Sequence, residues 1–298
     1  MKPFLIRMLI VGVLCGGALA LRPVGQVFAA DDGEQGALQA DKSLSAALGK
    51  ADKSAAGKLL DADFVWTDTQ GKSLKKAEVL ETLPTFAADN MSDEKVQTHF
   101  YGLLETVVGA HHNARFLKIW VKRAAGWREF LELDTPTSAE PAPARMPAGN
   151  AAKGDCDNPC RTLPFKPVTD MDKAILTAWQ KTKVDEWHPD ADDWQTHIAD
   201  EFLIINSGSM RDKPDRVALA KKQQEAGAGG PGDPITSMEM YDFGDNAAVM
   251  ISHHVPKRGG RPYYNVRTWT LRDGRWQLTV SQQTSIQSEA AVPPADSK

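Results

Sequence analysis

The chain has 298 residues, of which 35 are Lys or Arg, 39 are Asp or Glu and three are Cys. This length predicts two domains or one large one, and the charged fraction of 25% is that of a globular protein. The formal net charge of -4 offers no positive field to a phosphate backbone, so no nucleic-acid partner is expected. Three cysteines are too few for a disulfide-dense scaffold or a four-thiolate zinc site.

The N-terminal segment has the pattern of a secretory signal peptide. Lys2 and Arg7 precede an apolar run over residues 8–21, and small residues permit cleavage after Ala29 or, alternatively, after Ala20. A retained membrane anchor is the weaker alternative, because about 14 apolar residues fall short of the roughly 20 that span a bilayer. We therefore predict an exported protein, periplasmic or secreted, with no membrane contact after cleavage.

Cys156 and Cys160 are the two cysteines that remain after cleavage. In an oxidising compartment, two cysteines four residues apart favour a small disulfide loop, and Asn158-Pro159 favours the turn within it. The alternatives are a pair of free thiols and a redox-active pair, although the spacing is not C-x-x-C. A metal site at these cysteines would need two more ligands. The chain has no zinc signature and no phosphate-binding glycine loop, so we predict no metal and no cofactor.

The two halves of the chain resemble each other, which indicates an internal repeat. Residues 100–112 align with 242–254 without a gap at an offset of 142, which matches a glycine and both histidines of His111-His112 and His253-His254. Further along, an offset of 149 pairs Trp120 with Trp269 and Thr135 with Thr284. Upstream, residues 63–68 align with 201–206 at an offset of 138.

Each copy is predicted to run from a helix through a short strand and a second helix to three or four strands joined by tight turns. The opening helices are expected at residues 42–59 and 171–199, and the first strands at 64–69 and 202–207. The second helices are expected at residues 75–83 and 214–224. Pro214 suits the first turn of its helix, and Asp273-Gly274 marks the last hairpin. Helices followed by an antiparallel sheet predict an α+β fold.

This pattern divides the chain into five parts. They are a signal peptide (1–29), a first domain (30–135), a Pro/Ala-rich linker with the Cys156–Cys160 loop (136–169), a second domain (170–287) and a polar tail (288–298).

Three segments of the second copy carry a resemblance to a known fold: residues 202–207, 244–249 and 269–276. They resemble the nuclear transport factor 2-like fold, and within it SnoaL-like domains and domain-of-unknown-function 4440. The resemblance implies two tandem cone-shaped domains, each a curved antiparallel sheet wrapped on helices with an apolar pocket at one end. It also implies that the copies pair sheet to sheet as an intramolecular pseudo-dimer, or that the chain forms a homo-oligomer.

The histidine pairs are the first candidates for chemistry. Adjacent strand residues point to opposite faces, so only one of His111 and His112, and one of His253 and His254, can enter a pocket. Such a histidine would be a general base or a ligand-orienting group. The alternative is a histidine in the sheet interface or in solvent.

Asp68 is the candidate carboxylate, because it shares a strand face with Trp66. The alternative role is a turn residue that bonds its own backbone. Its counterpart Asn206 cannot act as a base, which argues against two identical active sites. Trp66, Asn206 and Tyr241 are the candidate ligand-binding residues.

The last strand of each copy alternates apolar and polar side chains. Its polar row is predicted to form a wet or interdomain sheet face and contains Gln277, Thr279, Ser281 and Gln283 in one copy and Arg128, Phe130, Glu132 and Asp134 in the other.

The leading hypothesis is an exported tandem SnoaL-like protein that binds a small apolar molecule or a partner in its cone pockets, without catalysis. The first alternative is an acid–base enzyme of the isomerase or cyclase type, with a pocket Asp or His. The second is a non-catalytic interaction module. Fold alone does not choose among them.

Overall fold

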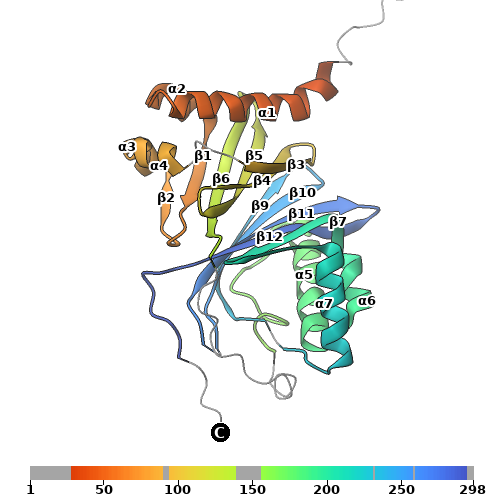
Figure 1. Ribbon diagram of the computed structural model, residues 1–298. Coiled ribbons are helices and arrows are strands. Elements are labelled where there is room, and N and C mark those ends of the chain that lie inside the picture. Colours follow the sequence, from red (N-terminus) through yellow and green to blue (C-terminus); the bar gives the residue numbers. More distant parts are fainter. Residues whose placement is uncertain (1–27, 90–93, 139–155, 231, 258, 294–298) are drawn as a thin grey trace, which may run out of the picture.

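The computed structural model describes residues 28–89, 94–138, 156–230, 232–257 and 259–293 (Figure 1). Residues 1–27 of the predicted signal peptide, 139–155 of the predicted linker and 294–298 of the predicted tail lie outside the described residues. Within the described part of the chain, no helix is long and apolar enough to cross a membrane.

The first domain is built from four helices and six strands. The helices are α1 (Phe28–Leu48), α2 (Lys53–Leu59), α3 (Lys76–Glu81) and α4 (Leu83–Asp89). The strands are β1 (Leu60–Thr67), β2 (Ser73–Lys75), β3 (Glu94–Phe100), β4 (Leu104–His111), β5 (Ala114–Arg123) and β6 (Gly126–Pro136).

The second domain repeats this order. Its helices are α5 (Asp170–Trp187), α6 (Ala191–Trp194), the 3-10 turn η3 (Gln195–His197) and α7 (Lys213–Glu225). Its strands are β7 (Ile198–Asn206), β8 (Ser209–Asp212), β9 (Ile235–Phe243), β10 (Ala247–His254), β11 (Tyr263–Arg272) and β12 (Arg275–Ser285).

The observed opening helix of the second copy ends earlier than the predicted one. In the second copy, α5 ends at Trp187, two residues before Pro189, which lacks the N–H that a continuing helix requires. Pro214 lies in the first turn of α7 as predicted, and the Asp212 side chain caps that helix by accepting from Asp215 N.

The two sheets have the same strand order, β2-β1-β6-β5-β4-β3 and β8-β7-β12-β11-β10-β9. The predicted α+β fold of two cone-shaped domains is confirmed. The sheets are mixed, however, and not purely antiparallel, because β1 pairs in parallel with β6 and β7 with β12. After the first hairpin the chain crosses through helices and builds β3 to β5, and β6 then runs beside β1 in the same direction.

Each sheet packs one face on its own helices and the other face on the second sheet (Figure 1). The helix-facing core of the first domain includes Phe64, Trp66, Phe116 and Trp120, and that of the second includes Trp179, Trp194, Phe202 and Trp269. A third core lies between the sheets and combines residues such as Leu117, Leu131, Val249 and Val280. The order of layers is therefore helix, sheet, sheet, helix.

Equivalent threonines of the two copies meet between the sheets. Thr135 Oγ1 lies 2.8 Å from Thr284 Oγ1, and both side chains are fully buried. Beside them, Gln282 Nε2 donates to Leu133 O at 2.7 Å and to Arg115 O at 3.1 Å. These hydrogen bonds satisfy polar groups that the interface removes from water.

Strand pairing corrects the register of the sequence repeat. Glu105 lies opposite Trp120, and Ala248 lies opposite the equivalent Trp269, so β4 and β10 correspond at an offset of 143 and not 142. One inserted residue of the second copy therefore precedes β10. The buried histidines His111 and His254 are equivalent at this offset, whereas the sequence alignment had paired His111 with His253.

A bulge in the last strand of each copy corrects the predicted polar row. The pairing shifts between Glu129 and Leu131 in β6, and between Leu278 and Val280 in β12. A one-residue bulge exchanges the two faces of the strand beyond it. Glu132 and Asp134 consequently face the interior of the first cone, and the expectation of a wet or interdomain row fails there.

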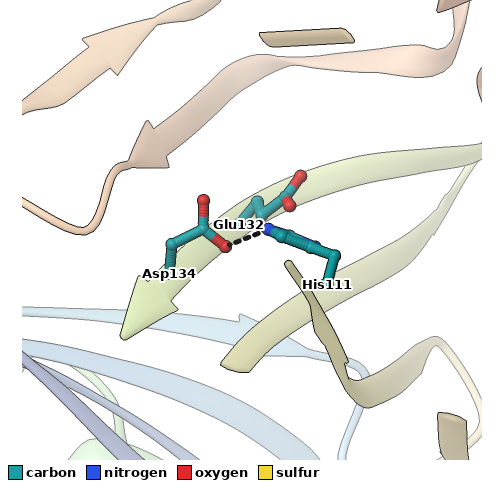
Figure 2. Close-up of side chains that lie close together, drawn as sticks. All are labelled: His111, Glu132 and Asp134. Carbon is teal, nitrogen blue, oxygen red and sulfur yellow. Dashed lines mark ion pairs between the residues drawn. The ribbon is translucent and has the colours of Figure 1, made fainter. Parts of the chain in front are cut away.

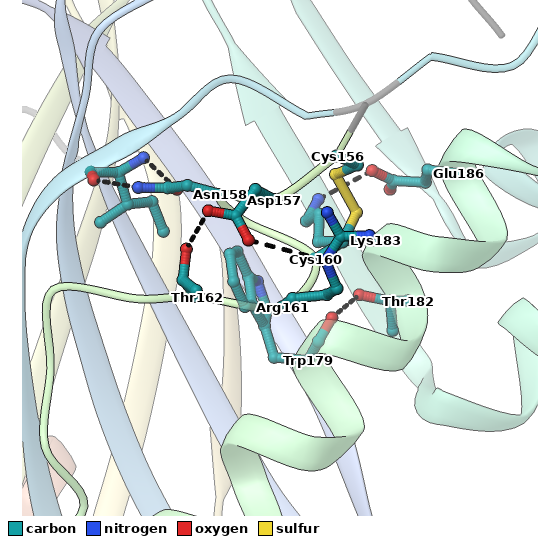
Figure 3. Close-up of a disulfide and its surroundings, with 11 residues drawn as sticks. Cys156, Asp157, Asn158, Cys160, Arg161, Thr162, Trp179, Thr182, Lys183 and Glu186 are labelled. Atoms are coloured by element: carbon teal, nitrogen blue, oxygen red, sulfur yellow. Dashed lines mark hydrogen bonds and ion pairs between the residues drawn. A yellow bond between two sulfur atoms is a disulfide. The ribbon is translucent and has the colours of Figure 1, made fainter. Parts of the chain in front are cut away.

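The predicted Cys156–Cys160 disulfide is present and packs against the second domain (Figure 3). Its loop is held at the start of β9 by Asn158, whose Nδ2 donates to Ile235 O at 2.8 Å while its Oδ1 accepts from Ile235 N at 2.9 Å. The disulfide is consistent with an oxidising compartment.

Candidate functional site

The interior of the first cone contains a buried cluster of His111, Glu132 and Asp134 (Figure 2). One ligand atom from each residue lies within 4.8 Å of the others, and the side chains are 3%, 0% and 2% exposed. His111 Nε2 lies 3.3 Å from Asp134 Oδ1. We call these three residues the His–carboxylate cluster.

Neighbouring aromatic side chains position the cluster. Trp66 on β1 donates its Nε1–H to Asp134 Oδ2 at 2.8 Å, which leaves Oδ1 directed at His111. The imidazole of His111 stacks on Phe116 of β5, with ring centroids 5.1 Å apart. These contacts fix the orientation of both side chains inside an apolar core.

Glu105 is a further buried acid on the same face of the first sheet. Neither of its carboxylate oxygens has a hydrogen-bond partner among the described residues, and the side chain is 1% exposed. Burial, followed by the negative charges of Glu34 and Asp41, raises the pKa of Glu105 to about 8. The side chain is therefore largely protonated at neutral pH.

The first cone is rich in acids. Its helix-facing side buries Glu105, Glu129, Glu132 and Asp134, and the buried basic side chains described on that side are Lys118 and His111. Lys118 lies opposite Glu132 in the strand register, with its ammonium 4.5 Å from the Phe116 ring centroid. Buried charges require compensation, and even with Glu105 neutral the carboxylates outnumber the lysine.

The second cone has the opposite character at the same positions. By strand register, the residues equivalent to Glu105, Glu129, Glu132 and Asp134 are, in this order, Ala248, Leu278, Ser281 and Gln283. Arg267 replaces Lys118 and donates to Ser252 Oγ at 2.8 Å, and Ser252 Oγ lies 2.9 Å from His254 Nε2. Burial, reinforced by Arg267, holds the pKa of His254 well below its usual value, so this imidazole is neutral.

A cavity of about 560 Å³ lies between the two sheets at their β1–β2 and β9–β10 edges. We call it the interdomain cleft. Its apolar walls come from both domains and include Phe130, Leu131, Leu133, Ile251, Tyr264 and Val266. Polar groups at the cleft include Asp63, Lys75, Glu78, Glu239 and His253. This size and mixture are usual for a small-molecule site.

Hydrogen bonds order the second domain's side of the interdomain cleft. Tyr241 donates its hydroxyl to Glu239 at 2.5 Å, and burial together with Glu239 raises the pKa of Tyr241. His253 lies with Nδ1 2.5 Å from Thr236 Oγ1 and Nε2 3.2 Å from Glu289. The Tyr241 ring packs edge-on against Phe130 of the first domain.

The structure separates the candidate residues into different environments. His111 and Trp66 meet at Asp134 in the first cone, His254 lies in the second cone, and Tyr241 and His253 line the interdomain cleft. The remaining candidates, His112, Asp68 and Asn206, lie at strand ends or turns.

His112 is exposed in the turn after β4, with a φ of 48°. The Asp68 carboxylate accepts hydrogen bonds from Gln70 N and Lys72 N at 2.9 Å. Asp68 is therefore a turn residue that bonds its neighbouring backbone, the role given above as the alternative to a catalytic carboxylate. Asn206 ends β7, opposite Ser209.

Sequence analysis missed the acids of the first cone as a group. Glu132 and Asp134 alternate with Leu131 and Leu133, and this alternation was visible. It was assigned to the wrong face, because the bulge before Leu131 has no sequence signature and the apolar row faces the other sheet. Glu105 and Glu129 could have been noticed only from the strand pairing through Trp120.

Comparisons with known proteins concern the fold. No family model matches the chain, and no curated protein matches it. It is similar to an NTF2-like protein from Cytophaga hutchinsonii (16% identity, TM-score 0.29), covering 33% of this chain and 93% of that one. An NTF2-like protein with a cystatin-like fold from Novosphingobium aromaticivorans has 15% identity and a TM-score of 0.33, covering 40% and 83%.

The association domain of CaMKII from C. elegans has 12% identity and a TM-score of 0.30, covering 39% of this chain and 95% of its own. The first two of these proteins are named NTF2-like, which is the fold predicted from the sequence for each domain, and the SnoaL-like or 4440-type assignment stays a prediction. At these identities the likeness says nothing of ligand or reaction.

Proposed function

We propose that this chain is an exported binding protein that holds a small molecule with an apolar body and a polar head in the interdomain cleft. The observation that carries the proposal is the cavity of about 560 Å³, with walls from both sheets and polar groups at its edge. The leading sequence hypothesis placed an apolar ligand inside the cones. The proposal moves the ligand between them, where a cavity is found in the described residues.

The charges at the interdomain cleft favour an amphipathic ligand over a wholly apolar one. Leu133, Ile251 and Val266 offer apolar contact, whereas Lys75 offers an ammonium donor and Asp63 a carboxylate acceptor. A ligand that fills the apolar part removes this surface from water, which contributes about 25 cal/mol per Å².

An acid–base enzyme receives less support from this geometry. Such an enzyme needs a buried titratable group in contact with a cavity. Among the described residues, Glu105, His111 and Asp134 are buried in the first cone but do not line the interdomain cleft. The titratable groups at the cleft, such as Glu239 and His253, are instead hydrogen-bonded to neighbouring side chains.

Native mass spectrometry of the full chain tests the proposal. Ile251 is half-buried on the cleft wall, so Ile251→Trp should fill the cleft and remove any bound small-molecule mass increment. Met210 is 46% exposed on β8 and does not line the cleft, so Met210→Trp is the matched control and should retain the increment. An increment that survives Ile251→Trp would contradict the proposed site.

A further inference from the structure

We propose that the His–carboxylate cluster of the first cone binds a divalent transition-metal ion, with Zn²⁺ as the most suitable probe. The three ligand atoms converge within 4.8 Å from two strands, β4 and β6. This inference concerns the first cone and does not depend on the ligand of the interdomain cleft.

The spacing of the donor atoms fits a shared ion. Metal–ligand bonds of about 2.0–2.2 Å place neighbouring ligand atoms roughly 3.0–3.5 Å apart. His111 Nε2 and Asp134 Oδ1 are 3.3 Å apart, and Asp134 Oδ1 accepts no hydrogen bond from the residues that the structure describes. One imidazole nitrogen with two carboxylates suits ions such as Zn²⁺ or Mn²⁺, whereas Ca²⁺ and Mg²⁺ prefer ligand sets made of oxygen.

The surroundings also fit a metal site. Trp66 Nε1–H holds Asp134 Oδ2 at 2.8 Å, the kind of outer contact that orients a ligating carboxylate. The charge balance supplies an independent argument. Glu129, Glu132 and Asp134 are each at most 2% exposed, and a divalent cation would add positive charge among these buried carboxylates.

A second cluster of possible ligands is a useful contrast. Asp185, Asp193 and His197 also converge, but Lys181 forms ion pairs with both aspartates. An ammonium therefore already provides the positive charge between these carboxylates. The second cluster is also less buried than the first, so we expect Zn²⁺ to prefer the His–carboxylate cluster.

Calorimetric titration of the chelator-treated full chain with ZnCl₂ tests the proposal. We expect one Zn²⁺ per chain, and His111→Asn or Asp134→Asn should weaken binding by more than about 100-fold, because each removes a ligand. Trp66→Phe keeps all three ligands and should weaken binding about 10- to 100-fold. His254→Asn is the matched control, since His254 occupies the equivalent buried position with Ser281 and Gln283 in place of Glu132 and Asp134, and it should leave the affinity unchanged.

A second measurement covers the failure of a variant to fold. Circular dichroism first establishes that each variant is folded. If His111→Asn or Asp134→Asn does not fold, the folded Trp66→Phe variant is titrated instead, and the visible absorption of bound Co²⁺ is recorded for this variant and the wild type. Weaker metal binding by Trp66→Phe with an altered Co²⁺ spectrum supports the proposal. The proposal is overturned if the wild type binds no Zn²⁺, if folded ligand variants bind as well as wild type, or if loss of binding follows His197→Ala instead.

Discussion

Replacing Glu105 by Gln should make the stability of the protein less dependent on pH. The folded pKa of Glu105 is about 8, whereas its reference value is 4.5. Because the folded state favours the protonated acid, the wild type has its full stability below pH 4.5 and loses part of it as the pH rises towards 8. The slope is at most about 1.4 kcal/mol per pH unit, and the total at most about 5 kcal/mol.

The amide introduced by Glu105→Gln would stay neutral throughout this range. The variant should therefore be close to wild type near pH 4.5 and several kcal/mol more stable near pH 8. Urea denaturation of both proteins at pH 5, 6, 7 and 8, in a chelator, measures this difference. His254 titrates in the opposite sense, since its folded pKa is lowered, but its contribution is common to both proteins. Glu81→Gln, at an exposed site on α3, is the control and should show no pH-dependent difference.

Parallel stability curves for the wild type and Glu105→Gln would refute the reasoning. They would mean that Glu105 is ionised in the folded state and that its charge is compensated. A difference that shrinks as the pH rises would refute the assigned sign.

Three further predictions concern the interface, the linker and the first cone. Gln282→Leu should lower the free energy of unfolding by about 1–3 kcal/mol in urea denaturation, because buried carbonyls lose their donor; no change would mean that they find other partners. Reduction of Cys156–Cys160 should cost about 2 kcal/mol in the same assay, as expected for so short a loop, and equal stability with and without dithiothreitol would contradict this. Lys118→Met should destabilise the metal-free protein by about 3–5 kcal/mol and strengthen Zn²⁺ binding, because it removes a cation from buried carboxylates; weaker Zn²⁺ binding by this variant would contradict the charge argument.

The sequence was sufficient for those parts of the fold that depend on local signals. Asp273 and Gly274 both have positive φ, as the tight last hairpin requires, and Pro214 lies in the first turn of its helix. The disulfide followed from compartment and spacing. The repeat predicted two similar domains, because the tryptophans and threonines of the last strands are retained in both copies.

The candidate site was less predictable, because it depends on strand register. Because one residue is inserted before β10, the equivalent of His111 is His254 and not His253. A single bulge in β6 moved Glu132 and Asp134 from one face to the other. Since side chains alternate with a period of two, an error of one residue reverses every facing assignment beyond it. The interdomain cleft depends on how two sheets meet, which local pattern does not encode.

The most direct test of the central claim, that the interdomain cleft binds a small amphipathic molecule, is a fluorescence titration with 1-anilinonaphthalene-8-sulfonate. The apolar ring system of this probe suits the apolar side chains that line the cleft, and Lys75 also lines it. We predict one saturable site in the wild type and in Met210→Trp, and its loss in Ile251→Trp. Equal titration curves for all three proteins, or no saturable binding to the wild type, would contradict the claim.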